Sequence, residues 1–205
     1  MSTESRGHSN APSADKRRWR TPPTLFRALQ AEMGKPFDLD ASASPGAEVC
    51  PIYIAPPGFD ASPAGRMPAG VDCLTTDWRR LLPDGGDVWF NPPWGVRLVG
   101  VPGTLAYVER AIEMCSPKLR VWMLVPNAPD TRWWRMAFSR AAEVRHLPRV
   151  SFLDPDTGEA LTAPPGSGVT LFILGPSRED PRQPRCNLAT VRGLCALPGS
   201  EVSDG

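Results

Sequence analysis

Several features that mark whole classes of proteins are missing from this chain. No apolar run approaches the ~18 residues that a membrane-spanning helix needs, and the first residues lack the apolar core of a signal peptide. The five cysteines form no CxxC pair, and the two histidines offer them no zinc-like spacing. An odd number of scattered thiols is typical of a reducing compartment. We therefore expect a cytoplasmic protein with no membrane segment, no metal and no disulfide framework.

Nucleotide-binding fingerprints and strong net charge are missing as well. Neither a GxGxxG sequence nor a P-loop occurs, which removes support for NAD and ATP binding. The formal net charge is only +1, so the chain as a whole is not steered toward nucleic acid. Any attraction for DNA or RNA must come from a local basic patch.

The chain is instead rich in proline, which accounts for 25 of 205 residues, and 41% of it is hydrophobic. This length is typical of one domain. Residues 1–18 contain almost nothing apolar and are predicted to be a disordered basic arm. Residues 19–175 are predicted to form the domain, and the polar, proline-rich residues 176–205 an irregular C-terminal tail.

Hydrophobic periodicity predicts strands and helices in alternation along the domain. One helix is expected at 22–33, with Thr21 as N-cap and Gly34 at its end, and a short one at 78–82, capped by Asp77. A third is expected at 104–115, with Leu105, Val108, Ile112 and Cys115 on its apolar side. A fourth is expected from Asp130, as its cap, to Ala142. Strands are expected at 37–40, 49–54, 87–90, 119–125, 144–147, 150–153 and 169–174. This alternation predicts an α/β fold with a doubly wound, mostly parallel, Rossmann-like sheet that binds ligands at its carboxyl edge.

The segment Asn91-Pro92-Pro93-Trp94 is the most informative one, because it directly follows an expected buried strand. Its two prolines stiffen the loop and keep Asn91 out of the helical conformation. The Asn91 amide oxygen and the Pro92 carbonyl can then accept the two hydrogens of a planar amino group, while Trp94 stacks on the attached ring. On its own, Asn-Pro-Pro is also an ordinary turn signal, so the upstream segments must decide.

Two acidic segments upstream suit a nucleoside. Asp40 ends an expected strand before a run of small residues, so its carboxylate could accept hydrogen bonds from ribose hydroxyls. Asp72 could accept a hydrogen bond from an adenine amino group, with Leu74 packed on the ring. Taken singly, an aspartate at such a junction is better explained as a cap.

In order, these segments resemble the phage-type DNA N6-adenine methyltransferases. The family reads roughly W-x-T-P, F-D-x-D-A-x-A, a cysteine and a tyrosine, D-x-L-x-x-D-W, and V-W-x-N-P-P-aromatic. This chain supplies Trp19, Thr21 and Pro22; Phe37, Asp38, Asp40, Ala41 and Ala43; Cys50 and Tyr53; Asp72, Leu74, Asp77 and Trp78; and Val88, Trp89 and Asn91 to Trp94. The likeness extends over about residues 19–174.

The resemblance implies an S-adenosylmethionine-dependent transferase, encoded by a phage or prophage, that methylates adenine N6 in double-stranded DNA. It implies catalytic roles for Asn91, Pro92, Pro93 and Trp94, and cofactor contacts for Thr21, Pro22, Asp38, Asp40, Ala41, Asp72 and Leu74. The target adenine must leave the duplex to reach such a pocket. A monomer or weak dimer is expected.

The chain departs from the family pattern in three places. Trp94 stands where tyrosine is common, and an asparagine common after the Asp40 segment is replaced near Gly46-Ala47. Residues 55–70 resemble an insertion.

Arginines outnumber acids between residues 132 and 149. The basic side chains are Arg132, Arg135, Arg140, Arg145 and Arg149, against the single acid Glu143. Arg132, Arg135 and Arg149 are candidate phosphate contacts, although a solvated helix face explains them equally well. The loop at 95–103 is a candidate lid or base-flipping element.

Other activities remain open at this point. Segments of the Asn-Pro-Pro-aromatic type also serve methyltransferases acting on cytosine N4, on guanine N2 in RNA and on protein glutamine. The glutamine and guanine enzymes usually carry a glycine-rich loop, which the residues from Asp40 to Ala43 lack. A non-catalytic DNA-binding relic of the fold is a further alternative.

Overall fold

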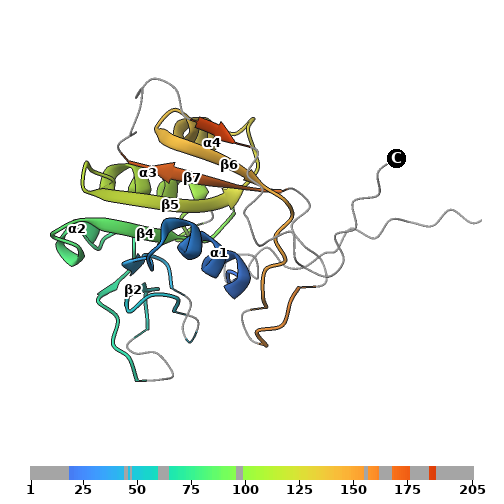
Figure 1. Cartoon of the computed structure of the whole chain (residues 1–205). Helices are drawn as coiled ribbons and strands as arrows, with labels where there is room; N and C mark the ends of the chain where they lie inside the picture. The colour runs from blue at the N-terminus through green and yellow to red at the C-terminus, as the bar shows by residue number, and fades with distance from the viewer. Residues whose placement is uncertain are drawn as a thin grey trace, which may run out of the picture.

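The computed structural model describes residues 19–43, 46, 48–59, 65–95, 99–154, 157–161 and 168–175, together with the backbone of 185–187. Within these residues, eight strands form one sheet in the order β3-β2-β1-β4-β5-β7-β6-β8 (Figure 1). The strands are β1 Leu39–Asp40, β2 Ile52–Ala55, β3 Gly70–Val71, β4 Gly86–Phe90, β5 Leu119–Pro126, β6 Ala141–Leu147, β7 Val169–Leu174 and β8 Arg185–Asn187. The helices are α1 Pro23–Met33, α2 Trp78–Leu81, α3 Thr104–Met114 and α4 Arg132–Phe138.

The sheet is mixed but mostly parallel. The strands from β3 to β5 all run in one direction, whereas β7 is antiparallel to both of its neighbours, β5 and β6. From β1 the chain moves outward to β2 and β3 and then returns to the other side of β1 as β4. Ligands bind outside the carboxyl ends of the strands at such a reversal of order. The mostly parallel sheet with its helices confirms the predicted α/β class. The reversal of strand order predicts a ligand site between the ends of β1 and β4.

Hydrophobic clusters cover both faces of the sheet. Val88 and Phe90 belong to the cluster that includes residues of α2, α3 and α4, whereas Trp89 packs with residues of α1. Successive side chains of β4 therefore point to opposite faces, as the two-residue period of a strand requires. Figure 1 shows α1 and α3 on opposite sides of the sheet. In the described part of the chain, no helix has the length and hydropathy needed to cross a bilayer.

The start of α1 differs from the expectation in a way that matters for the site. Pro22 occupies the N-cap position, Pro23 begins the helix, and no side chain caps it. The prediction that Thr21 caps α1 is therefore wrong, and the Thr21 hydroxyl is available for another partner. Gly34 ends the helix with φ +72°, as predicted.

The segment after β5 was also predicted incorrectly. Thr131, not Asp130, caps α4, because its hydroxyl accepts a hydrogen bond from the Trp134 amide at 3.3 Å. The helix ends at Phe138 instead of Ala142, and Ala141 already belongs to β6. Pairing with β7 overrides the helical propensity of residues 141–143.

Three further expectations need correction. The buried residues of α3 are Thr104, Tyr107, Val108, Ala111 and Met114, so its apolar side is rotated from the predicted one. The expected strand at 150–153 is reduced to isolated bridges from Leu153 to Arg20 and Ala160. Regular structure continues past Gly175, because β8 pairs with β6 inside the segment interpreted as an irregular tail.

A charged network closes the edge of the sheet where β4 and β5 begin. The Asp87 carboxylate is almost wholly buried and accepts hydrogen bonds from Arg120 Nε at 2.7 Å and Trp122 Nε1 at 2.8 Å. Lys35 Nζ lies 2.8 Å from Oδ2, the other oxygen of the Asp87 carboxylate. Burial alone would raise the pKa of Asp87, but the hydrogen bonds from Lys35, Arg120 and Trp122 outweigh it and lower the pKa.

Candidate active site

The ends of β1 and β4 lie side by side at the carboxyl edge of the sheet. Asp40 is the register partner of Trp89, and the Ala41 amide donates to the Trp89 carbonyl at 2.9 Å. One step further along, the Ser42 hydroxyl donates to the Asn91 backbone carbonyl at 2.8 Å. The Asp40 loop and the Asn91 loop are thus joined by hydrogen bonds at the point where the strand order reverses.

The Asn91 amide is held by its nitrogen. Asn91 Nδ2 donates to the Thr21 hydroxyl at 3.2 Å and to the Trp19 carbonyl at 3.4 Å. Because a carbonyl oxygen can only accept, the atom that faces Trp19 must be the amide nitrogen. The orientation of the Asn91 side chain is therefore set by residues about 70 positions earlier in the chain.

The oxygen of the same amide receives no hydrogen bond from any described residue. This atom, Asn91 Oδ1, is buried. A buried polar atom left unpaired costs roughly 1–3 kcal/mol, so such atoms need an explanation, and a ligand is one. Asn91 Oδ1 is thus oriented to receive one N–H donor.

Trp94 does not present the open ring that the sequence predicted. Its side chain is only 7% exposed, and Nε1 donates to the Leu124 carbonyl at 3.3 Å. The ring meets Phe152 edge to face at a centroid distance of 4.9 Å and Trp19 at 6.1 Å. Trp94 therefore anchors the loop in the hydrophobic core, and the expected stacking surface is corrected to a packing contact.

Asp40 is a buried carboxylate at the centre of the edge. Its oxygens accept hydrogen bonds from the backbone amides of Ser42 at 3.2 Å and Val49 at 3.4 Å. Burial raises the pKa of Asp40 to about 7, and the two amide hydrogen bonds offset only part of that effect. The carboxyl group is therefore balanced between its neutral and ionised forms near neutral pH.

The Asp72 loop lies at the same edge, after β3. The Asp72 amide donates to the Ala55 carbonyl at 2.8 Å, and Asp72 Oδ1 accepts from the Leu74 amide at 2.9 Å. Asp72 adopts φ +63°, and it is the only residue other than glycine with a positive φ among those described. Such backbone conformations cost free energy and cluster at ligand sites.

The structure does not bring Asp38 together with these residues. Asp38 precedes β1, and its carboxylate accepts from the Asp87 amide at 2.8 Å and from Lys35 Nζ at 3.0 Å. It therefore belongs to the charged network at the opposite end of the strands. Ala41 is at the correct edge, but its methyl group is buried in the core, so only its backbone faces the loops.

The predicted arginine flank divides in two. Arg132, Arg135 and Arg149 are exposed and form no ion pair with another described residue, whereas Arg145 is buried. Arg145 pairs with Glu32 and Glu143, each at 2.7 Å, so this member of the arginine-rich segment is neutralised within the protein. Arg149 follows β6, which ends at the same edge as β4 and β5 because both β5 and β6 are antiparallel to β7.

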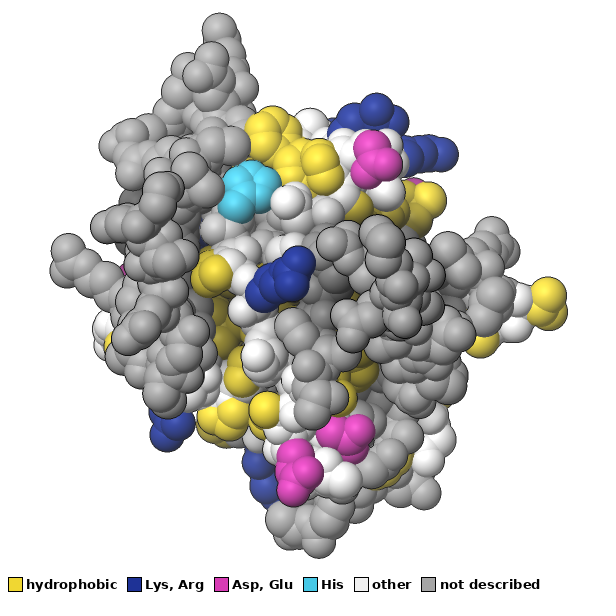
Figure 2. Space-filling model, turned by 90° about the vertical axis from the view of Figure 1, so that its right-hand side faces the viewer, with side chains coloured by type: hydrophobic (Ala, Val, Ile, Leu, Met, Phe, Trp, Pro, Cys, Tyr) yellow, Lys and Arg dark blue, Asp and Glu magenta, His cyan; other side chains and the backbone are white. Residues whose placement is uncertain are grey.

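Figure 2 shows the side of the molecule toward which β4 and β5 run in Figure 1. Where this face is described, hydrophobic side chains are exposed in several places, and basic and acidic side chains lie among them, one basic side chain near the centre. The face therefore offers both an apolar surface and charged groups near the ends of the parallel strands.

Two participants were missed by sequence reasoning. The Trp19 carbonyl orients the Asn91 amide, and the Ser42 hydroxyl holds the Asn91 backbone. Both residues lie inside segments that were already singled out, so their proximity to the site could have been expected. Their partners could not, since each contact joins segments far apart in the chain.

The fold is that of an α/β protein, and the polar groups described above gather at the carboxyl edge of its parallel strands. In the described residues no group of His, Cys, Asp and Glu side chains is placed to hold a metal ion. The model of one family, DNA N-6-adenine-methyltransferase (Dam), matches residues 8–193. The chain belongs to this family, which implies DNA adenine-N6 methyltransferase activity and a DNA substrate. No curated protein matches the chain.

Proposed function

We propose that this protein uses S-adenosylmethionine to methylate the N6 atom of an adenine flipped out of double-stranded DNA. The observation that carries this proposal is the Asn91 amide, whose nitrogen is tied to Trp19 and Thr21 while its buried oxygen has no described partner. An exocyclic amino group supplies the N–H donor that this oxygen lacks. Membership of the adenine-N6 family agrees with such a substrate.

The strand order supports a Rossmann-like domain. The order β3-β2-β1-β4-β5 is that of doubly wound nucleotide-binding sheets, which bind their ligand at the reversal between β1 and β4. We assign the catalytic domain to residues 19–175 together with β8, which pairs with β6, and the basic arm predicted at 1–18 lies outside the described residues.

The residues at the carboxyl edge suit a nucleoside cofactor. Asp40 would accept hydrogen bonds from the ribose hydroxyls, because it is an acid at the end of the central strand. Asp72 would accept from the adenine amino group, with half-buried Leu74 against the ring. Thr21, Pro22 and the Ala41 backbone complete the set, and S-adenosylmethionine, when bound, supplies an electrophilic methyl group.

The chain's own contribution to the reaction is positioning. Asn91 Oδ1 and the Pro92 carbonyl accept the two amino hydrogens, which directs the nitrogen lone pair out of the plane of the base. Pro93 fixes the loop, and Trp94 anchors it in the core. Such alignment can supply about 7–11 kcal/mol of a reaction barrier.

The proposal is tested by measuring transfer of a labelled methyl group from S-adenosylmethionine to plasmid DNA, with tRNA and protein as parallel acceptors. Label in DNA alone supports the proposal. Label in tRNA would indicate a guanine methyltransferase, and label in protein a glutamine methyltransferase. No label in any acceptor would indicate a non-catalytic protein.

Cofactor affinity should depend on the ionisation of Asp40. Ribose hydroxyls donate best to the carboxylate, so lowering the pH one unit below the raised pKa of about 7 should weaken binding by roughly tenfold. Calorimetric titration with S-adenosylhomocysteine between about pH 5.5 and 8.5 measures this slope. Asp40→Asn should bind weakly at every pH, and an equal slope in that variant would show that another group titrates.

The same shift sets the effect of Asp40 on stability. A carboxyl group with a raised pKa favours the folded state most at acidic pH, below its unfolded pKa of about 3.8, and that contribution is lost as pH rises through about 7. Asp40 therefore disfavours folding at the pH where the proposal needs it ionised, as expected of a residue retained for binding.

Exposed arginines should contribute to DNA affinity. Replacing Arg132, Arg135 and Arg149 together with glutamine should weaken duplex binding and reduce the salt dependence of log K by about 0.9 for each phosphate that is no longer neutralised. Fluorescence anisotropy over a salt series measures both effects. Arg80→Gln is the matched control, since Arg80 is 88% exposed on α2, which precedes the start of β4. A salt slope equal to that of the control would remove these arginines from the DNA interface.

A further inference from the structure

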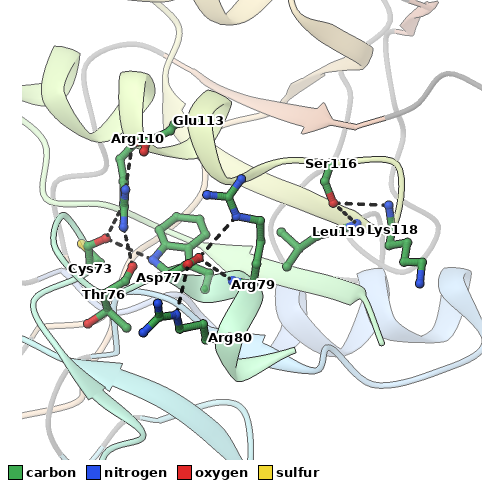
Figure 3. Close-up of polar contacts among 11 residues, drawn as sticks. Cys73, Thr76, Asp77, Arg79, Arg80, Arg110, Glu113, Ser116, Lys118 and Leu119 are labelled. Carbon is green, nitrogen blue, oxygen red and sulfur yellow. Dashed lines mark hydrogen bonds and ion pairs between the residues drawn. The ribbon is translucent and has the colours of Figure 1, made fainter. Parts of the chain in front are cut away.

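Arg110 of α3 is a half-buried cation that binds the backbone of the Asp72 loop. Its side chain is only 11% exposed, and it donates from Nε to the Cys73 carbonyl at 3.3 Å and from Nη2 to the Thr76 carbonyl at 2.5 Å. Its third contact is an ion pair with Glu113 at 2.8 Å. Figure 3 shows Arg110 reaching from its helix to Cys73 and Thr76.

These hydrogen bonds control a loop whose shape is otherwise costly. The loop begins with Asp72 at φ +63°, and Trp78 Nε1 also donates to the Cys73 carbonyl at 3.0 Å. A guanidinium group suits the position because its planar donors can reach two carbonyls at once while it stays charged. Without it, the Thr76 carbonyl would lose a charge-assisted hydrogen bond and the turn after Asp72 would be less well fixed.

The same helix also holds the Asn91 loop. Thr104 begins α3, and its amide and hydroxyl both donate to the Gly95 carbonyl, at 3.0 and 3.2 Å, while the hydroxyl accepts from the Gly95 amide at 3.0 Å. Arg110 is six positions after Thr104, which is about 9 Å along a helix. The helix α3 therefore contacts two loops. Its first residue, Thr104, contacts the loop after β4, and Arg110, near the middle of the helix, contacts the loop after β3.

We propose that Arg110 is a positioning residue that fixes the Asp72 loop relative to the Asn91 loop, so that α3 sets the distance between cofactor and target base. This inference rests on the proposed function, in which Asp72 and Leu74 receive the adenine of S-adenosylmethionine. Arg110 would act through the backbone of Cys73 and Thr76, to which it donates its hydrogen bonds.

The test compares Arg110→Ala, Arg110→Lys and the control Arg80→Ala in the full-length protein. Calorimetry with S-adenosylhomocysteine gives cofactor affinity, and steady-state kinetics give KM for S-adenosylmethionine, KM for DNA, and kcat. Arg110→Ala should raise the dissociation constant and KM for the cofactor by roughly ten- to a hundredfold and should also lower kcat, because the cofactor is no longer held at the right distance from the base, while KM for DNA changes much less. Arg110→Lys should recover part of the affinity, because an ammonium group can reach one carbonyl but not both.

A purely structural role would lower Tm without this selective loss of cofactor affinity. If Arg110→Ala does not fold, Arg110→Lys carries the test, with amide hydrogen exchange of residues 72–77 as second readout and faster exchange expected. Wild-type affinity and exchange in a folded Arg110 variant would overturn the inference while leaving the proposed function intact. Failure of the wild-type protein itself to bind the cofactor would overturn the proposed function.

Discussion

Asn91→Ala will reduce methyl transfer to DNA by at least about a hundredfold while changing cofactor affinity only a few fold. The substitution removes a side-chain acceptor that, alone among the buried side-chain acceptors of the described residues, has no hydrogen-bond donor. Loss of a single preoriented hydrogen-bonding group of this kind typically costs 10²–10³ in rate. Initial rates with duplex DNA, together with calorimetry for S-adenosylhomocysteine, measure the two effects separately.

Asn91→Asp is the matched variant for this prediction. It keeps the size of the side chain and an acceptor oxygen, but it replaces the amide nitrogen that donates to the Trp19 carbonyl. Two acceptors would then face each other, so the side chain should turn and activity should fall as well. Near wild-type turnover in Asn91→Ala would remove Asn91 from the reaction, whereas full activity in Asn91→Asp alone would show that Trp19 does not orient the side chain.

The second large effect concerns stability. Asp87→Ala should lower the free energy of unfolding by about 1–3 kcal/mol, because the buried Trp122 indole N–H loses its acceptor, while Lys35 and Arg120 are 44% and 36% exposed and can turn toward water. The substitution leaves Arg120, Lys35 and the Trp122 indole N–H without their shared acceptor. Urea denaturation followed by tryptophan fluorescence measures the change.

Asp84→Ala is the control for this effect, because Asp84 is an exposed acid three residues earlier. It should leave the unfolding midpoint nearly unchanged. The lowered pKa of Asp87 also predicts that its stabilisation is present above the unfolded pKa of about 3.8 and is lost as pH falls below it. Equal midpoints for the two variants at neutral pH would show that the network around Asp87 is energetically neutral.

Most of the elements could be predicted from the sequence because they depend on local pattern, whereas the short strands β3 and β8 were not predicted. Buried strands such as β5 are nearly continuous apolar runs, and Gly34 marks the end of α1 directly. The helix predicted to run to Ala142 failed because pairing with β7, nearly thirty residues later, decides that segment. Local propensity carries no information about such a partner.

The site could be predicted only at the level of which segments take part. Asp38 and Asp40 look equivalent in the sequence, yet they lie toward opposite ends of the strand, and only Asp40 faces the Asn91 loop. From the sequence, Trp94 could equally stack on a ligand or pack in the core. Its ring contacts with Trp19 and Phe152 show that it packs in the core. Counting charges could not reveal that Arg145 is neutralised by Glu32, 113 residues away.

The most direct measurement is the identity of the methylated nucleoside. Duplex DNA is incubated with the protein and S-adenosylmethionine, digested to nucleosides and analysed by mass spectrometry, with Asn91→Ala as the parallel sample. The account predicts N6-methyldeoxyadenosine with the wild-type protein and almost none with the variant. N4-methyldeoxycytidine, no methylated nucleoside at all, or equal amounts of N6-methyldeoxyadenosine from both proteins would contradict it.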